Sequence, residues 1–160
     1  PGPMNAVVKL PPVMKDPEKD PKVIVTLTST PKGSYKLKQV FDSLIKQSYQ
    51  PDEVHVNIPY NSSRGLGEYP DIEQFAWNWT SYYNHGIKVF RTQDWGALTN
   101  IIPTRARVHR RNHTLLIVVD DDKVLPATLV ADHVRAFRTN PNSSKFSEHM
   151  PWLQCHARYG

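Results

Sequence analysis

Short apolar runs rich in β-branched residues alternate along this chain with helical patterns, and this alternation constrains the fold more than any other feature. The predicted strands are 22–29 (KVIVTLTS), 53–59 (EVHVNIP), 87–91 (IKVFR) and 115–119 (LLIVV). The predicted helices are 34–49, 71–83, 97–111 and 126–140. Strands and helices that alternate through short links form a mostly parallel sheet with helices on its faces. We therefore expect an α/β fold, and 152–157 (WLQCHA) is compatible with a fifth strand.

The beginning of the chain has a different composition from the rest. Residues 1–21 hold six prolines and no hydrophobic periodicity, so we interpret them as a Pro-rich leader or linker that is irregular and lies on the surface. Residues 22–160 are predicted to form one small domain, because a chain of 160 residues can build a single core. No apolar run approaches the roughly 20 residues of a membrane helix, so we expect no membrane segment in this sequence.

The net charge of +5 and the pI of about 9.4 favour anionic partners without choosing among them. The basic residues are spread along the chain, and no basic tract alternates with aromatic residues as in a single-strand binder. We therefore expect no nucleic-acid partner. One cysteine and the absence of HxxxH or HExxH spacing exclude a cysteine-rich or helical zinc site.

Two features point to different cellular compartments. A single cysteine is typical of a reducing compartment such as the cytoplasm. Four N-x-S/T sequons, more than the composition predicts, would place the chain in the secretory pathway or Golgi lumen if they are used. Localisation therefore stays open at this point.

Three aspartates, Asp120 to Asp122, directly follow the apolar run 115–119. Ligands of open parallel sheets bind at the carboxyl ends of the strands, so the triplet belongs among the candidate site residues. Crowded carboxylates raise one another's pKa, and a divalent cation is the usual compensation. Asp120 and Asp122 can face one site because alternate side chains of an extended segment share a face. One alternative is a solvated turn with a helix N-cap before 126–140. The other is a set of carboxylates at a strand end of a phosphotransfer domain.

Three segments, in this order and spacing, resemble a family of nucleotide-sugar-dependent glycosyltransferases with the GT-A fold. They are VTLTSTPKGSYKLKQVFDSLIKQSYQPDEVHVNIP (25–59), GIKVFRTQDWGALTNIIP (86–103) and LLIVVDDDKVLP (115–126). The similarity extends over about residues 22–140, and the aspartate triplet stands where the family has its DxD motif. The resemblance implies a mostly parallel, Rossmann-like sheet flanked by helices, and a sugar donor linked to a nucleoside diphosphate.

The family's binding residues can be transferred to matching positions of this sequence. Residues 28–31 (Thr28, Ser29, Thr30 and Pro31) would border the nucleobase and ribose, and 94–96 (Asp94, Trp95 and Gly96) would close over the ribose and diphosphate. Asp120 and Asp121 would lie on the nucleotide side of the triplet. Asp120 and Asp122 would hold Mn²⁺ or Mg²⁺, with Asp122 as the direct ligand of the ion that bridges the diphosphate.

The sequence departs from the family pattern in two places. The family's Pro-Ala-Thr-Lys after the glycine is replaced by 97–100 (ALTN), and Arg105, Arg64 or Lys32 would have to substitute for the missing lysine. Only 38 residues follow Asp122, where the family has a longer acceptor half, so we interpret the domain as truncated in its acceptor half. The catalytic base is therefore unknown, and the weak local candidates are Glu148, His149 and His156.

The resemblance thus implies a metal-dependent glycosyltransferase that moves a sugar from a nucleoside diphosphate to a hydroxyl of an unknown glycan, lipid or protein acceptor. Two alternatives remain: a non-catalytic module of the same fold that binds a nucleotide or glycan, and a Mg²⁺-dependent phosphotransfer domain.

Overall fold

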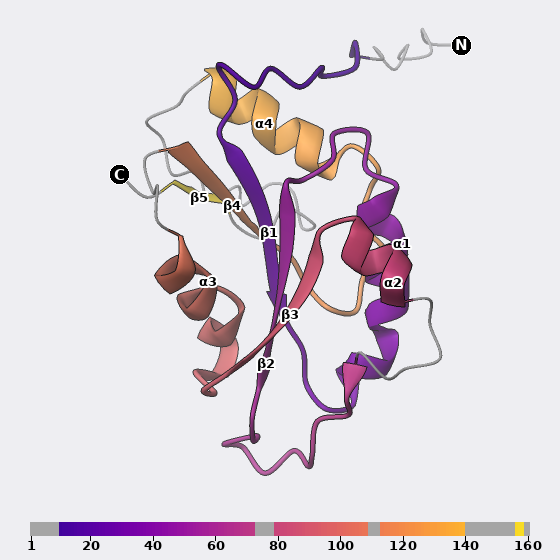
Figure 1. Cartoon of the computed structure of the whole chain (residues 1–160), viewed down its shortest axis with the longest axis vertical. Helices are drawn as coiled ribbons and strands as arrows, with labels where there is room; N and C mark the ends of the chain where they lie inside the picture. Colours follow the sequence, from indigo (N-terminus) through magenta and orange to yellow (C-terminus); the bar gives the residue numbers. More distant parts are fainter. Residues whose placement is uncertain (1–9, 73–78, 109–112, 140–155, 159–160) are drawn as a thin grey trace, which may run out of the picture.

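One sheet with the strand order β3-β2-β1-β4-β5 organises the computed structural model, which describes residues 10–72, 79–108, 113–139 and 156–158 (Figure 1). The strands are β1 (Lys22–Thr28), β2 (Glu53–Pro59), β3 (Ile87–Thr92), β4 (Thr114–Val118) and β5 (His156–Arg158). β1 pairs in parallel with β2 and β4, and β2 pairs in parallel with β3. β5 is antiparallel to β4. The predicted α/β fold with a mostly parallel, Rossmann-like sheet is therefore confirmed.

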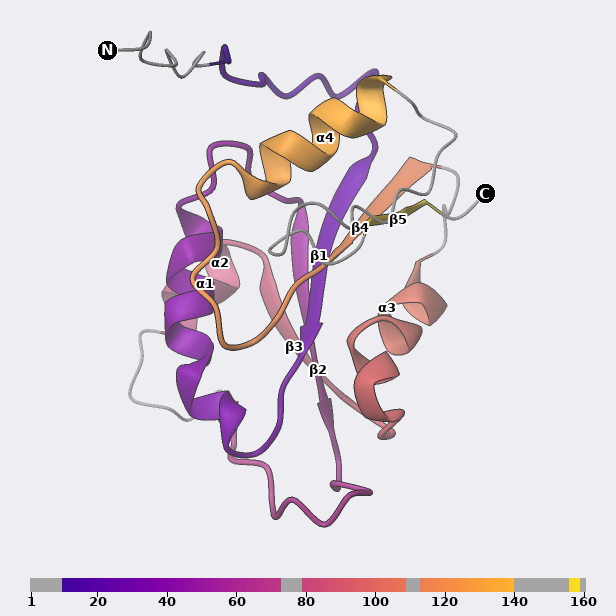
Figure 2. The same ribbon diagram turned by 180° about the vertical axis from the view of Figure 1, so that it is seen from behind.

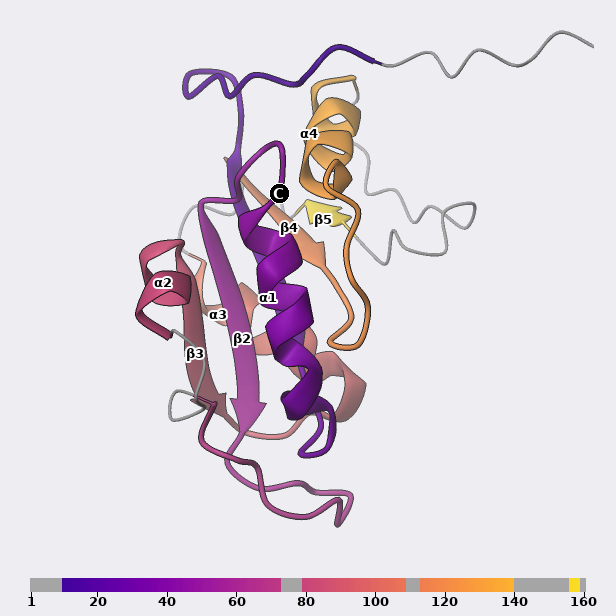
Figure 3. The same cartoon turned by 90° about the vertical axis from the view of Figure 1, so that its right-hand side faces the viewer.

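The helices cover the sheet from two sides. They are η1 (Gly33–Lys36), α1 (Leu37–Ile45), α2 (Trp79–Asn84), η3 (Gly96–Asn100), α3 (Ile102–Arg107) and α4 (Leu129–Thr139). Figure 3 shows α1, α2 and α4 on the near side of the sheet and α3 on the far side, and Figure 2 gives the view from behind.

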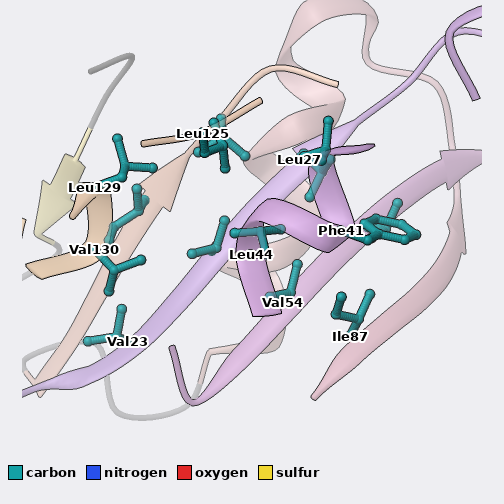
Figure 4. Packing of buried hydrophobic residues seen from close by; sticks show 14 of the residues in the cluster. Val23, Leu27, Phe41, Leu44, Val54, Ile87, Leu125, Leu129 and Val130 are labelled. Atoms are coloured by element: carbon teal, nitrogen blue, oxygen red, sulfur yellow. The ribbon is translucent and has the colours of Figure 1, made fainter. Parts of the chain in front are cut away.

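The hydrophobic core lies between the sheet and α1 with α4. Alternate residues of β1, namely Val23, Val25 and Leu27, face this side and are fully buried. They pack against the apolar stripe of α1, in which Phe41 and Leu44 lie close to β1 and β2 (Figure 4). A Leu or Phe side chain buried in this way contributes roughly 2–3 kcal/mol through removal of apolar surface from water.

The predicted helices 97–111 and 126–140 are shorter than their patterns indicated, and a proline explains the first difference. The segment 97–111 divides into η3 and α3, because Pro103 has no amide hydrogen and is accommodated in the first turn of a new helix. The segment 126–140 becomes helical only at Leu129, after an irregular stretch that follows the aspartates.

The remaining helical and strand boundaries also differ from the pattern. The segment 34–49 begins as the 3₁₀ turn η1 and ends at Ile45. Of the predicted helix 71–83, residues 73–78 lie outside the described residues, and α2 begins at Trp79 and continues to Asn84. Of the predicted strand 152–157, residues 152–155 lie outside the described residues, and β5 begins at His156.

Residues 10–21, the described part of the predicted leader, are irregular and lie against α4. Asp20 makes two hydrogen bonds with Arg138, each of 2.7 Å, and accepts a third from the Tyr49 hydroxyl at 2.8 Å. The Asp20 side chain is only 2% exposed. Burial would raise the pKa of this carboxyl, but hydrogen bonds from Arg138, the Asp16 backbone and Tyr49 outweigh it and lower the pKa to about 2.

Within the described residues, no helix has both the length and the apolar character that a membrane crossing requires.

Asp20→Asn is expected to lower the free energy of unfolding at pH 7 by about 1–2 kcal/mol, because the Arg138 and Tyr49 donors lose an ionised acceptor. The pKa of Asp20 is lower in the folded chain than in the unfolded chain. Its contribution is therefore complete above about pH 4 and disappears as the pH falls towards 2. Urea unfolding of both proteins between pH 2 and 7 measures this, and parallel pH profiles would contradict it.

Candidate functional site

The loops that follow the four parallel strands meet at one edge of the sheet and enclose a pocket of about 200 Å³. Of the predicted site residues, those that line the pocket are Thr28, Ser29, Thr30, Asp94, Gly96, Asp120 and Asp121. They come from three different loops, and the parallel register of the sheet brings them together. This is the edge at which open α/β sheets bind ligands.

Two larger cavities, of about 900 and 710 Å³, are lined in part by the leader and contain none of the predicted site residues. Both are also lined by residues close to segments outside the described residues: Arg138 is two residues before 140–155, and Val108 is directly before 109–112. We therefore place the candidate site at the smaller pocket, where the carboxylates and the strand ends coincide.

The aspartate triplet divides at the pocket. Asp120 and Asp121 are half-buried and line it, whereas Asp122 is exposed and is not part of the lining. Asp120 forms an ion pair with Lys123 at 3.2 Å, and Asp121 accepts a short hydrogen bond from the Ser29 hydroxyl. The structure thus brings two of the three carboxylates to the cleft.

Gly33 allows Asp121 to lie against the loop after β1. A Cβ atom at this position would collide with Oδ2 of Asp121 and would lie 2.9 Å from the hydroxyl oxygens of both Ser29 and Thr30. The backbone of Gly33 also donates a hydrogen bond to Thr30 Oγ1 at 2.9 Å. The missing side chain is therefore what lets a carboxylate and two hydroxyls crowd together here.

Asp94 is saturated by hydrogen bonds within the chain. Its Oδ2 accepts from the backbone and the hydroxyl of Ser63, both at 2.8 Å. Its Oδ1 accepts from the Gly96 backbone at 2.8 Å and from the Thr99 hydroxyl at 3.3 Å. The Ser63 hydrogen bonds are the main cause of a lowered Asp94 pKa. This carboxylate is therefore ionised and holds two loops of the pocket together.

The other predicted residues lie outside the pocket lining. Trp95 is 47% exposed, Arg105 is exposed on α3, and Pro31 is buried in the loop after β1. Glu148 and His149 lie outside the described residues. His156 opens β5 opposite Ile117 of β4, and only its backbone is described.

Two residues of the lining, Tyr69 and Val119, were not among the candidate site residues that the sequence singled out after the strands. Burial is the main cause of the raised pKa of Tyr69, and the nearby carboxylates of Asp94 and Asp121 raise it further. Tyr69 lies in an irregular loop with no periodic pattern, so only its position after a strand could have pointed to it.

A polar network fixes the wall of the pocket that η3 forms. On the face of the sheet opposite the core, the buried side chains of Thr26 and Asn57 contact Thr104 at 2.7 and 2.9 Å. The Thr26 hydroxyl donates to the backbone oxygen of Asn100, a pocket residue. Arg107 donates to the side-chain oxygen of Asn57 and stacks on Phe90, with 3.8 Å to the ring centroid.

Burial lowers the pKa of Arg107 to about 10, which leaves it charged at neutral pH. Burial also lowers the pKa of the neighbouring His55 to about 4, so His55 is neutral there. Its Nδ1 accepts from Arg107 at 3.3 Å, and its Nε2 contacts Glu53 at 3.1 Å. A neutral imidazole next to the guanidinium avoids a repulsion between two buried cations.

Carboxylate oxygens are the ligands that Mg²⁺ and Mn²⁺ prefer, and the pocket presents those of Asp120 and Asp121. The described residues contain no group of three or more His, Cys, Asp or Glu side chains suited to a metal ion. These residues fit a hard cation only as a partial ligand set, and the oxygens of water and of a bound ligand would have to complete it.

Comparison with solved structures finds TarS from S. aureus. Its crystal structure (residues 1–349) is 16% identical to this chain, with a TM-score of 0.52, over 81% of this chain and 39% of TarS. The fold of this chain is similar to that of the TarS glycosyltransferase. The crystal structure of TarS in complex with UDP matches at 14% identity and a TM-score of 0.51, over 83% of this chain and 38% of TarS.

The similarity to TarS concerns the fold, and this chain spans about 39% of the length of the TarS 1–349 chain. No protein-family model matches the sequence. A search of curated proteins also finds no match.

Gly33→Ala is expected to displace the Asp121 carboxylate and to cost about 1–3 kcal/mol of stability, because the added methyl group has no space. Urea unfolding measures the loss, and a crystal structure of the variant would show the shifted side chain. An unchanged stability would mean that Asp121 does not occupy this position.

Asn57→Ala is expected to lower the free energy of unfolding by about 2–3 kcal/mol, because it leaves buried donors of Arg107 without their acceptor. Asn61→Ala, at an exposed asparagine of the loop after β2, is the matched control and is expected to have almost no effect. Equal losses in the two variants would argue against the network.

Proposed function

We propose that this chain is the donor-binding part of a metal-dependent glycosyltransferase, which moves a sugar from a nucleoside diphosphate to a hydroxyl acceptor. The supporting observation is the pocket itself. On a fold similar to that of TarS, it joins the carboxylates after β4 to the Thr-Ser-Thr turn after β1. TarS has been crystallised with UDP, which makes a UDP-sugar the first donor to test.

Different loops of the pocket would contact different parts of the proposed donor. Residues 28–30 would border the base and ribose, and the turn at Gly96 would lie over the ribose and diphosphate. The pocket of about 200 Å³ is smaller than a typical ligand pocket of ~300 Å³ or more, so the sugar would extend beyond it. Pro31, Trp95 and Arg105 do not line the pocket, and their contact with the donor stays a prediction.

Asp120 and Asp122 stay the proposed ligands of Mn²⁺ or Mg²⁺, with Asp121 held aside by Ser29. Asp122 is exposed and outside the pocket lining, so its side chain would have to turn towards the pocket to bind the ion. The ion, when bound, would stabilise the negative charge that develops on the departing diphosphate. Lys123, which now pairs with Asp120, would have to release that carboxylate. The catalytic base and the acceptor are not assigned, and the acceptor class stays glycan, lipid or protein.

A non-catalytic binding module of the same fold is the second candidate. It is favoured by the engagement of all three pocket carboxylates: Asp94 with Ser63, Asp120 with Lys123 and Asp121 with Ser29. A carboxylate already engaged in this way is a poor general base. The two candidates differ in turnover and share the donor site.

Incubation with UDP-, GDP- and dTDP-sugars and Mn²⁺, followed by measurement of free nucleotide, separates these candidates. Release of nucleotide supports the transferase, and binding without release supports the module. Failure to bind any nucleotide, with or without metal, contradicts both and favours the phosphotransfer alternative.

Asp120→Asn and Asp122→Ala are each expected to abolish Mn²⁺-dependent binding of the nucleotide and to leave the fold intact, because each removes a charged ligand of the ion. Isothermal titration with and without Mn²⁺ measures this, and circular dichroism checks the fold. Asp132→Asn on α4, which lies outside the pocket, is the control. If Asp122→Ala binds as tightly as the unchanged protein, Asp122 is not a ligand.

A further inference from the structure

We propose that residues 60–70, here called the 60–70 loop, form an anion clamp over the pocket, in which Arg64 binds the diphosphate and Asp94 is the positioning residue. This inference rests on the proposed function, because it names the group that would hold the donor phosphates. It also replaces the family lysine missing at Asn100 by a residue of a different loop.

The first support is the way in which Asp94 ties the 60–70 loop to the sheet. One carboxylate oxygen accepts both the backbone and the hydroxyl hydrogen of Ser63 at 2.8 Å. The other oxygen accepts from Gly96 and from Thr99, and Thr99 is only 1% exposed. The residue next to Ser63 is Arg64, so this attachment holds the backbone from which the Arg64 side chain lines the pocket.

The second support is that packing contributes little to the same stretch. Residues 63–68 are exposed, and Gly65 and Gly67 have φ angles of +64° and +96° with open space around them. Gly65 and Leu66 donate hydrogen bonds only back to Ser62. Within the described part of the chain, residues 61–67 make hydrogen bonds to one other segment, and both of these bonds go to Asp94. Loss of the Asp94 acceptor should therefore release this part of the loop.

The third support is the distribution of charge around the pocket. Arg64 lines the pocket together with three carboxylates, and each of these carboxylates already has a partner within the chain. Across the described part of the chain, no carboxylate lies within 4.0 Å of the Arg64 guanidinium. A guanidinium group can donate two parallel hydrogen bonds to two phosphate oxygens, and the Arg64 guanidinium is available for this arrangement.

The test compares Arg64→Ala, Arg64→Lys and Lys46→Ala by titration with inorganic pyrophosphate and with UDP in the presence of Mn²⁺. Lys46→Ala removes the same charge at the far end of α1, outside the pocket. Arg64→Ala is expected to weaken both ligands about tenfold or more, and Arg64→Lys to restore part of the affinity. Lys46→Ala should change them less than about twofold. Equal effects of Arg64→Ala and Lys46→Ala would overturn the clamp.

The role of Asp94 is tested by a double-mutant cycle. Asp94→Asn is expected to weaken pyrophosphate binding about tenfold in the Arg64 protein and to add little in the Arg64→Ala protein. Equal losses in both backgrounds would overturn the positioning role. Ser63→Ala removes the hydroxyl bond to Asp94 and keeps the Asp94 carboxylate and the Ser63 backbone bond. A smaller loss that also depends on Arg64 is expected.

Hydrogen exchange of the unliganded protein is an independent measurement. Asp94→Asn should accelerate exchange of the 60–70 loop while leaving β1 and β2 protected, and unchanged exchange would overturn the attachment. If no nucleotide binds but pyrophosphate binds through Arg64, the proposed function fails and the clamp stands. If UDP binds equally well to Arg64→Ala, the clamp fails and the proposed function stands.

Discussion

The parallel pairing of β1 with a neighbour on each side is the constraint on which the rest of the structure depends. Because β1 pairs with β2 and β4, and β2 with β3, the carboxyl ends of four strands point to one edge. Each loop at that edge comes from a distant part of the sequence. A threonine-serine turn, the 60–70 loop with Arg64, the turn with Asp94 and Gly96, and two aspartates therefore become neighbours without any local signal that they should.

The two faces of the sheet contact their helices through different interactions. The face towards α1 and α4 is apolar, with residues such as Val25 and Leu27 fully buried, and it supplies most of the stability. The opposite face carries Thr26 and Asn57, which bond to η3 and α3 rather than only packing against them. Hydrogen bonds are directional, so this face holds the pocket wall in one position, as Asp94 does for the loop beside it.

Local patterns predicted the strands well and the helices less well. The β-branched runs 22–29 and 53–59 became β1 and β2 almost unchanged, because a fully buried parallel strand needs a continuous apolar sequence. Helical periodicity overestimated 97–111, where Pro103 starts a separate helix. The short antiparallel β5 also differs from the predicted segment, since its pairing with β4 depends on a contact distant in sequence.

By itself, the sequence determined the α/β class and the strand ends at which a site would form, because hydrophobic periodicity and strand length are local properties. It also singled out Asp120, Asp94 and the turn at 28–30. Only the tertiary structure decided that Asp121 rather than Asp122 lines the pocket, and that Asp94 is held by Ser63. Which way a side chain points at a strand end depends on partners such as Ser29 and Gly33, which lie about 90 residues away along the chain and become neighbours only when the sheet forms.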